Sequence, residues 1–280
     1  MIAVLGGLGA AACWATATMC ASRSTMLIGP WSVLAWVMLV GFVVTLPFVA
    51  ASGIPDSLGA HDLGWLALSG GGNIGGLLFV YTALRIGKVS IVAPITSTEG
   101  AIAAVLAVIT GETLGRGAGL MLVVIALGVL LASIGPGGGS GEPLRATMFA
   151  AAAALCFGVS LYATGRASAV LPLMWAVFPA RLLGVLVVAV PLALTRRLQL
   201  TRRAVPLVVT SGLCEVLGFA SYALGSRHGI AVAAVLASQF AALAAVAAYF
   251  LFHERLTRVQ LAGISAIALG VAVLTALQAA

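Results

Sequence analysis

Long apolar runs follow one another along this chain from end to end. Each is roughly 17–24 residues long, which is enough for an α-helix to cross the ~30 Å hydrocarbon core of a bilayer. Hydrophobic residues make up 62% of the sequence and charged residues only 8%, so a water-soluble fold of this length could not bury the apolar surface. The sequence therefore predicts an all-α integral membrane protein with about ten transmembrane helices. The runs lie near 2–21, 30–50, 63–84, 90–110, 118–134, 144–164, 171–194, 204–225, 230–252 and 258–278.

The two halves of the chain repeat short phrases in the same order. "IALGV" occurs at Ile125–Val129 and again at Ile267–Val271. "GETLGR" (Gly111–Arg116) precedes the first copy, and "HERLTR" (His253–Arg258) precedes the second. Both elements recur at an offset of 142 residues, about half of the 280-residue chain. An ordered series of matches at one offset indicates an internal duplication.

Each half contains about five of the expected helices, and five is an odd number. The second half must then enter the membrane from the side opposite to the first. Two related units of opposite orientation form the inverted repeat of many secondary transporters. We therefore expect two inverted five-helix repeats, at residues 1–134 and 144–280, joined by the glycine-rich linker "GPGGGSGEP" at 135–143.

With these motifs in place, the chain resembles the drug/metabolite transporter superfamily, specifically transporters built from two EamA-type domains. "GETLGR" and "HERLTR" are similar to that family's Gly-Glu-Arg-Leu signature before the last helix of each repeat. The resemblance covers the whole chain and implies transport, but it does not identify a substrate. Prolines of the family pattern would fall at positions 99 and 241, where this chain has Glu99 and Ala241.

Three charged residues fall inside the expected helices. They are Glu99 in "PITSTEGAIAA", Arg181 in "VFPARLLG" and Glu215 in "SGLCEVLGFASY". A charge at the centre of a transmembrane helix costs about 2.5–3.5 kcal/mol on insertion scales, so each needs a reason to be there. Asn73 and Gln239 are milder polar members of the same group.

These charges allow two interpretations. Glu99 and Glu215 could line a central cavity, where they exchange protons, bind cationic substrate groups, or do both in competition. Alternatively, one glutamate neutralises Arg181 in a buried pair, and the other carboxylate has no basic partner in the membrane. Glu215 is our first choice for mutation, because no basic residue lies within two turns of it along its helix and because Asn73 is its equivalent in the repeat.

Several aromatic and acidic residues extend this hypothesis. Tyr222 follows Glu215 by two helical turns and lies on nearly the same face, although ordinary helix packing would give the same stripe. Trp14 and Trp175 are candidate cavity aromatics. The signature acids Glu112 and Glu254 lie at helix junctions, and we interpret them as capping residues rather than substrate ligands.

The leading hypothesis is a secondary transporter of the cell (plasma or inner) membrane. We expect it to export small metabolites or drug-like compounds by alternating access, with protons as a candidate coupling ion. Its expected partners are a small-molecule substrate and the lipid bilayer, without nucleic acid; the oligomeric state stays open. No P-loop, catalytic motif or metal-ligand spacing occurs in the sequence, so we expect no enzyme activity, cofactor or metal. An intramembrane enzyme and a structural membrane subunit are the alternatives.

The basic residues predict an orientation. Ten Lys and Arg residues lie in or beside the loops after odd-numbered helices, and three lie beside the even-numbered ones. Basic loops stay in the cytoplasm. The charges therefore predict that both termini lie outside the cytoplasm, whereas the resemblance favours termini inside it.

Overall fold

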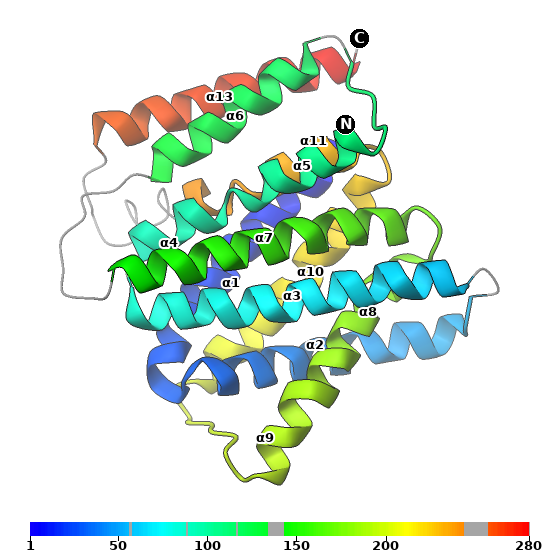
Figure 1. The fold of residues 1–280 in the computed structure, drawn as a ribbon, viewed down its shortest axis with the longest axis vertical. Helices are drawn as coiled ribbons and strands as arrows, with labels where there is room; N and C mark the ends of the chain where they lie inside the picture. Colours follow the sequence, from blue (N-terminus) through cyan, green and yellow to red (C-terminus); the bar gives the residue numbers. More distant parts are fainter. Residues whose placement is uncertain (56–57, 88, 116, 134–142, 244–256, 280) are drawn as a thin grey trace.

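The computed structural model describes residues 1–55, 58–87, 89–115, 117–133, 143–243 and 257–279. Within these ranges every regular element is a helix (Figure 1). Among the described residues, six helical stretches are long and apolar enough to cross a membrane. They are α1 (Ile2–Ile28), α2 (Pro30–Ser52), α3 (Ala60–Ile86), α7 (Pro143–Ser168), the α8–α9 stretch (Leu173–Leu194) and α10 (Val205–Ser226).

Five further helices are described, and all of them except α13 are shorter than the six above. They are α4 (Val89–Thr96), α5 (Glu99–Ile109), α6 (Ala118–Ser133), α11 (Ile230–Ala237) and α13 (Arg258–Ala279). The prediction of an all-helical, membrane-embedded chain is confirmed, and the count of about ten spanning helices stays a prediction. Of the expected linker at 135–143, only Pro143 is described, and it is the first residue of α7.

The fourth expected helix (90–110) is kinked rather than continuous. It bends at Ser97 and Thr98, between α4 and α5. The Thr98 N–H donates to Ile95 O, only three residues back, and the Thr98 hydroxyl donates to the same carbonyl (2.8 Å). Hydroxyl groups that bond to nearby carbonyls compete with the regular helix. Sequence reasoning missed this kink because an apolar run shows no break where polar atoms bond locally.

The ninth expected helix (230–252) bends in the same way after α11. The Gln239 N–H donates to Leu236 O, and the Ser238 hydroxyl donates to Val235 O (2.8 Å). Residues beyond 243 in this run lie outside the described ranges. The two kinks occupy matching places in the two halves of the sequence.

The seventh expected helix (171–194) contains a π-helical turn. It begins as α8 (Leu173–Gly184), continues as η1 (Val185–Ala189) and ends as α9 (Val190–Leu194). Pro191, the second residue after the π-helical turn, has no N–H to donate, which disturbs the regular hydrogen-bond ladder. The stretch remains one continuous helical rod.

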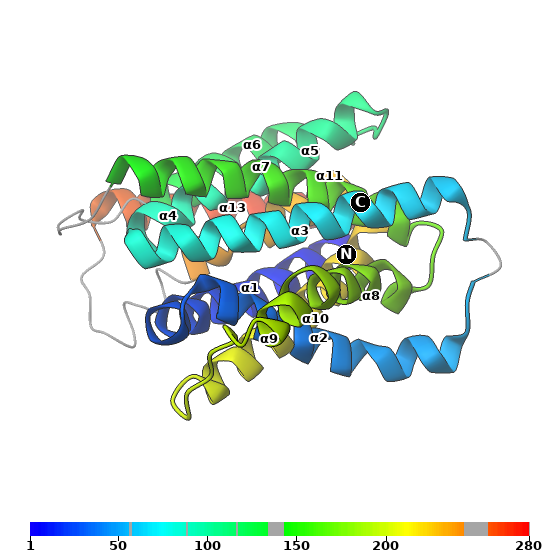
Figure 2. The same ribbon diagram turned by 60° about the horizontal axis from the view of Figure 1, so that its bottom comes forward.

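Helices from the two halves pack against each other in pairs. α1 packs along α10, and α3 packs along α7. α6 and α13 form an outer pair, next to the pair α5 and α11, while α2 and α8 lie at the other end of the molecule (Figures 1 and 2). Every one of these pairs joins a first-half helix to a second-half helix.

The outer pair explains why "IALGV" occurs twice. A Cβ added at Gly128 of the first copy would lie 3.0 Å from Ile267 of the second, and one added at Gly270 would lie 2.6 Å from Ile125. Each glycine therefore makes room for the isoleucine of the other copy. Residues 125 and 128 lie beside residues 270 and 267, so α6 and α13 run antiparallel.

Candidate substrate cavity

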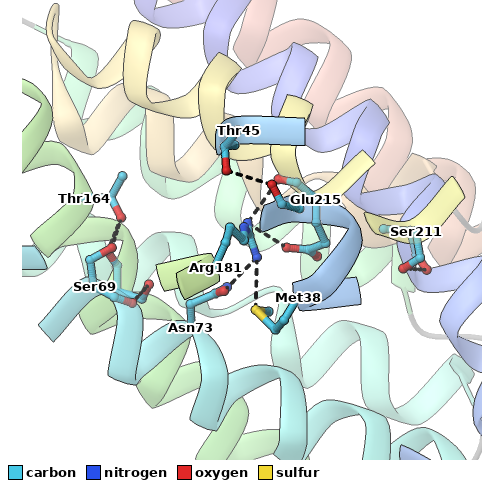
Figure 3. Close-up of polar contacts among 11 residues, drawn as sticks. Met38, Thr45, Ser69, Asn73, Thr164, Arg181, Ser211 and Glu215 are labelled. Atoms are coloured by element: carbon cyan, nitrogen blue, oxygen red, sulfur yellow. Dashed lines mark hydrogen bonds and ion pairs between the residues drawn. The ribbon is translucent and has the colours of Figure 1, made fainter. Parts of the chain in front are cut away.

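Arg181 lies at the centre of a buried polar cluster on α8 (Figure 3). The residue is 1% exposed. Its stem passes Gly41 of α2, where an added Cβ would lie 2.8 Å from Arg181 Cδ. Only a glycine on α2 leaves room for the arginine to reach the middle of the bundle.

The guanidinium group of Arg181 joins both halves of the chain. Its Nη1 donates to Asn73 Oδ1 of α3 (3.1 Å) and lies 3.8 Å from Met38 Sδ of α2. Its Nη2 donates to the backbone oxygen of Glu215 on α10 (3.4 Å). Asn73 and Glu215 are equivalent repeat positions, so Arg181 contacts both members of that pair.

Glu215 is the acid partner of Arg181. Its Oε2 lies 3.6 Å from Arg181 Nη2, and the two side chains are 8% and 1% exposed. A buried charge is strongly destabilising unless it is paired. The structure thus contains the pairing that the second interpretation of the sequence described, with Glu215 as the paired carboxylate.

A cavity lies beside this cluster, bounded by α1, α3, α4, α5, α7, α10 and the segment that follows α11. The cavity volume is about 50 Å³, and the whole space between its walls, with its opening included, is about 510 Å³. Most of the lining is apolar. The lining residues used below are Trp14, Tyr81, Glu99, Phe157, Glu215, Phe219 and Phe240.

Two walls of the cavity are built alike. The Trp14 ring lies against Gly218, where an added Cβ would approach Trp14 Nε1 to 2.5 Å. The Phe157 ring lies against Gly76, where an added Cβ would approach the ring to 2.5 Å. Gly76 and Gly218 are repeat equivalents, and Phe157 is the residue that the repeat places over Trp14. One aromatic ring from each half thus faces the same cavity.

Glu99 enters the cavity from the kink between α4 and α5. It is the first residue of α5 and is 4% exposed. Acidic side chains are favoured at a helix N-terminus. Within the described part of the chain, Glu99 forms no ion pair or side-chain hydrogen bond. It is therefore the carboxylate that the Arg181 pairing leaves without a basic partner.

Other residues expected at the site are distributed differently. Tyr222 is fully buried, donates its hydroxyl to Leu161 O (2.9 Å) and packs 6.3 Å from the Trp14 ring. Gln239 lies in the kink after α11, and its Nε2 has no partner among the described residues. Trp175 does not line this cavity. Its Nε1 donates to Gly53 O (2.9 Å), beyond the end of α2.

Sequence reasoning missed several residues of the site. Tyr81, Phe157, Phe219 and Phe240 read as ordinary apolar residues of long helices. A signal for Phe157 was present, since the repeat that pairs Cys13 with Cys156 also pairs Trp14 with Phe157. For Met38 and Gly41, nothing in the sequence distinguished residues that contact the arginine from their apolar neighbours.

Glu112 caps a helix of the opposite half. Its carboxylate accepts the backbone N–H groups of Ile230 (3.0 Å) and Ala231 (3.1 Å), at the start of α11. Carboxylates stabilise helix N-termini by accepting these free N–H groups. The interpretation of Glu112 as a capping residue is confirmed, and Glu254 lies outside the described residues.

Comparisons with known proteins agree with this architecture. No curated protein matches the chain. Among solved structures, 22 chains match; one, described as "Crystal structure of protein", is 20% identical, with a TM-score of 0.74 over 98% of this chain and 96% of that one. At this identity the likeness shows the fold alone. The profile of the EamA-like transporter family matches residues 1–134 and 144–276, which together are nearly the whole sequence. The chain therefore belongs to the EamA-like transporter family and is a multi-pass membrane protein.

Proposed function

We propose that this chain is a secondary transporter that moves small molecules by alternating access. The observation that carries the proposal is the cavity between matching walls of the two halves, with the unpaired Glu99 on its surface. A site that both halves enclose can be opened to either side of the membrane by rocking one half against the other. Membership of the EamA-like family supports transport as the general activity, and the cavity is the candidate site where a substrate would bind.

The proposed mechanism needs two inverted five-helix repeats. Three observations support them. α6 and α13 pack antiparallel through the two "IALGV" copies. The packing of α1 along α10 is matched by that of α7 along α3. The kinks before Glu99 and after α11 occupy matching places. We take residues 1–134 and 144–280 as the two repeats, joined by the linker at 135–143.

Glu99 is the group that we propose to couple transport to protons. An ionised carboxylate without a partner is costly in a dry interior, so either a proton or a cationic substrate must neutralise it. Among the described charged groups, Glu215 lines the same cavity as Glu99, and Arg181 pairs with Glu215. Arg181 already neutralises Glu215, which leaves Glu99 to exchange protons. This proposal replaces Glu215 as our first choice.

We propose export of small metabolites or drug-like compounds across the plasma or inner membrane. Nothing in the site requires a nucleotide, since the sequence has no P-loop, so the driving force would be an ion gradient. The cavity is narrow and mostly apolar, which suits small organic molecules.

Solute counterflow in liposomes tests this function. The purified chain is first screened by thermal shift against amino acids, amines and nucleosides, because a ligand stabilises the fold that binds it. Each stabilising solute is then tested for exchange with its radiolabelled form in proteoliposomes. We expect saturable exchange of at least one solute, and its loss in folded Glu99→Gln protein. Solutes that stabilise the protein but never exchange would contradict a transport function.

A further inference from the structure

The charges that line the cavity leave one unbalanced negative group. Glu215 and Arg181 neutralise each other across 3.6 Å. Glu99 lies on the same cavity, and no described basic side chain pairs with it. The lining with its Arg181 neighbour therefore has a net charge of −1 when Glu99 is ionised. A ligand with one positive charge would restore neutrality.

The rest of the lining is suited to an apolar body. The rings of Trp14, Phe157, Phe219 and Phe240 face the cavity from four different helical segments. The Phe219 ring already has a cation beside it, because Arg181 Cζ lies 5.1 Å from its centroid. The other three rings have no described cationic contact. Aromatic faces attract cations, and more strongly where water is excluded.

We infer that the cavity binds small organic monocations with an apolar, preferably aromatic, body. This inference rests on the proposed transport function and names its substrate class. The cationic group lies against the Glu99 carboxylate, and the apolar body lies between the Trp14 and Phe157 rings. Arg181 does not oppose the cation, because Glu215 lies 3.6 Å from its Nη2 and neutralises its charge, and because Asn73 accepts a hydrogen bond from its Nη1.

Other ligand classes fit the cavity less well. An anion would place a second negative charge beside Glu99, since Arg181 is already occupied. A metal cation requires several oxygen ligands, and the mostly apolar lining offers one unpaired carboxylate, with a few hydroxyl groups as its other side-chain oxygens outside the Glu215–Arg181 pair. A neutral apolar compound would pack against the rings but gain nothing from the Glu99 carboxylate. Only an organic cation can both pair with the Glu99 carboxylate and pack against the aromatic rings.

Binding of a matched series of one-ring probes tests the inference. Phenethylamine and benzyltrimethylammonium carry a positive charge, 2-phenylethanol is neutral, 3-phenylpropionate is negative, and ethylamine lacks the ring. Isothermal titration calorimetry on the full chain in detergent gives the affinities. We expect both ring cations to bind at least about tenfold more tightly than the alcohol, as for a charge-assisted contact. We also expect ethylamine and 3-phenylpropionate to bind more weakly than either cation.

Variants assign the effect to Glu99. Glu99→Gln should reduce the cation affinities to that of the alcohol, and Glu99→Asp should keep the preference for cations. Asp62→Asn is the matched control, because Asp62 caps α3 through Gly59 N (3.1 Å) and is not part of the lining. It should bind as the unmodified chain does. Melting temperature and gel filtration verify that each variant is folded.

The outcomes separate this inference from the transport function. Equal binding of the alcohol or the anion overturns the inference, as does unchanged cation binding in folded Glu99→Gln protein or failure of both ring cations to bind. In each of these cases, counterflow of another solute would leave the transport function standing. Cation binding without counterflow would support the binding site and contradict transport.

Discussion

At the scale of single residues, the site depends on how one arginine is held. Arg181 has three partners from three helices, namely Asn73, Met38 and Glu215. A buried pair of this kind adds little net stability, but removal of one partner is costly because it leaves the other charge uncompensated. The sequence allowed either glutamate to be the partner. Which one lies within 3.6 Å depends on how α8 and α10 cross, and the sequence of neither helix encodes that crossing.

Substitution of the two glutamates should affect stability very differently. Glu215→Gln removes the charge opposite Arg181 and should cost about 3–5 kcal/mol, whereas Glu99→Gln removes an unpaired charge and should be neutral or stabilising. The measurement is the melting temperature of each purified variant in the same detergent. Restoration of stability by the double change Arg181→Met and Glu215→Leu would support the pair. Equal melting temperatures for Glu215→Gln and Glu99→Gln would contradict it.

At the scale of helices, the repeated phrases predicted which elements correspond but not how they touch. "IALGV" marked α6 and α13 as equivalents, and their reciprocal glycine and isoleucine contacts followed only in three dimensions. The positions of the helices were predictable because each apolar run is long enough to mark a membrane-spanning helix. The kinks at Ser97–Thr98 and Ser238–Gln239 were not, because hydroxyl hydrogen bonds to nearby carbonyls decide them. Glu99 enters the cavity from one of these kinks, so the missed local structure was the part that positions the site.

The outer pair predicts coupled effects of two substitutions. Gly270→Ala should destabilise the chain by about 1–3 kcal/mol, because the new methyl group overlaps buried Ile125. Ile125→Ala alone should also destabilise it, by leaving a cavity. The double variant should lose less than the sum of the two, because the new methyl fills part of that space. Thermal melting measures all three. Gly71→Ala is the control, since an added Cβ there meets nothing within 4 Å. Strict additivity would show that the two residues do not touch.

At the scale of the whole molecule, more of the basic residues lie at one end of the helices than at the other. Arg85 lies in the last turn of α3, Arg145 lies in the first turn of α7, and four arginines lie at 196–203 between α9 and α10. The start of α1 and the end of α13 lie close together at the opposite end in both views (Figures 1 and 2). The asymmetry counted in the sequence is thus also an asymmetry in space. Arg116, Arg166 and Arg227 are the basic residues assigned to the other side of the membrane.

This distribution predicts that both termini lie outside the cytoplasm. Positive charge near the ends of transmembrane helices is retained in the cytoplasm, so the end with Arg85, Arg145 and the 196–203 loop should face inward. Alkaline phosphatase fused after residue 280 should therefore be active, and a fluorescent protein at the same position should stay dark. Replacement of the four arginines at 196–203 by alanine should weaken the bias and reduce the phosphatase signal. An inactive phosphatase fusion together with a bright fluorescent fusion would place both termini in the cytoplasm. Packing between the two halves would then outweigh loop charge in setting the orientation.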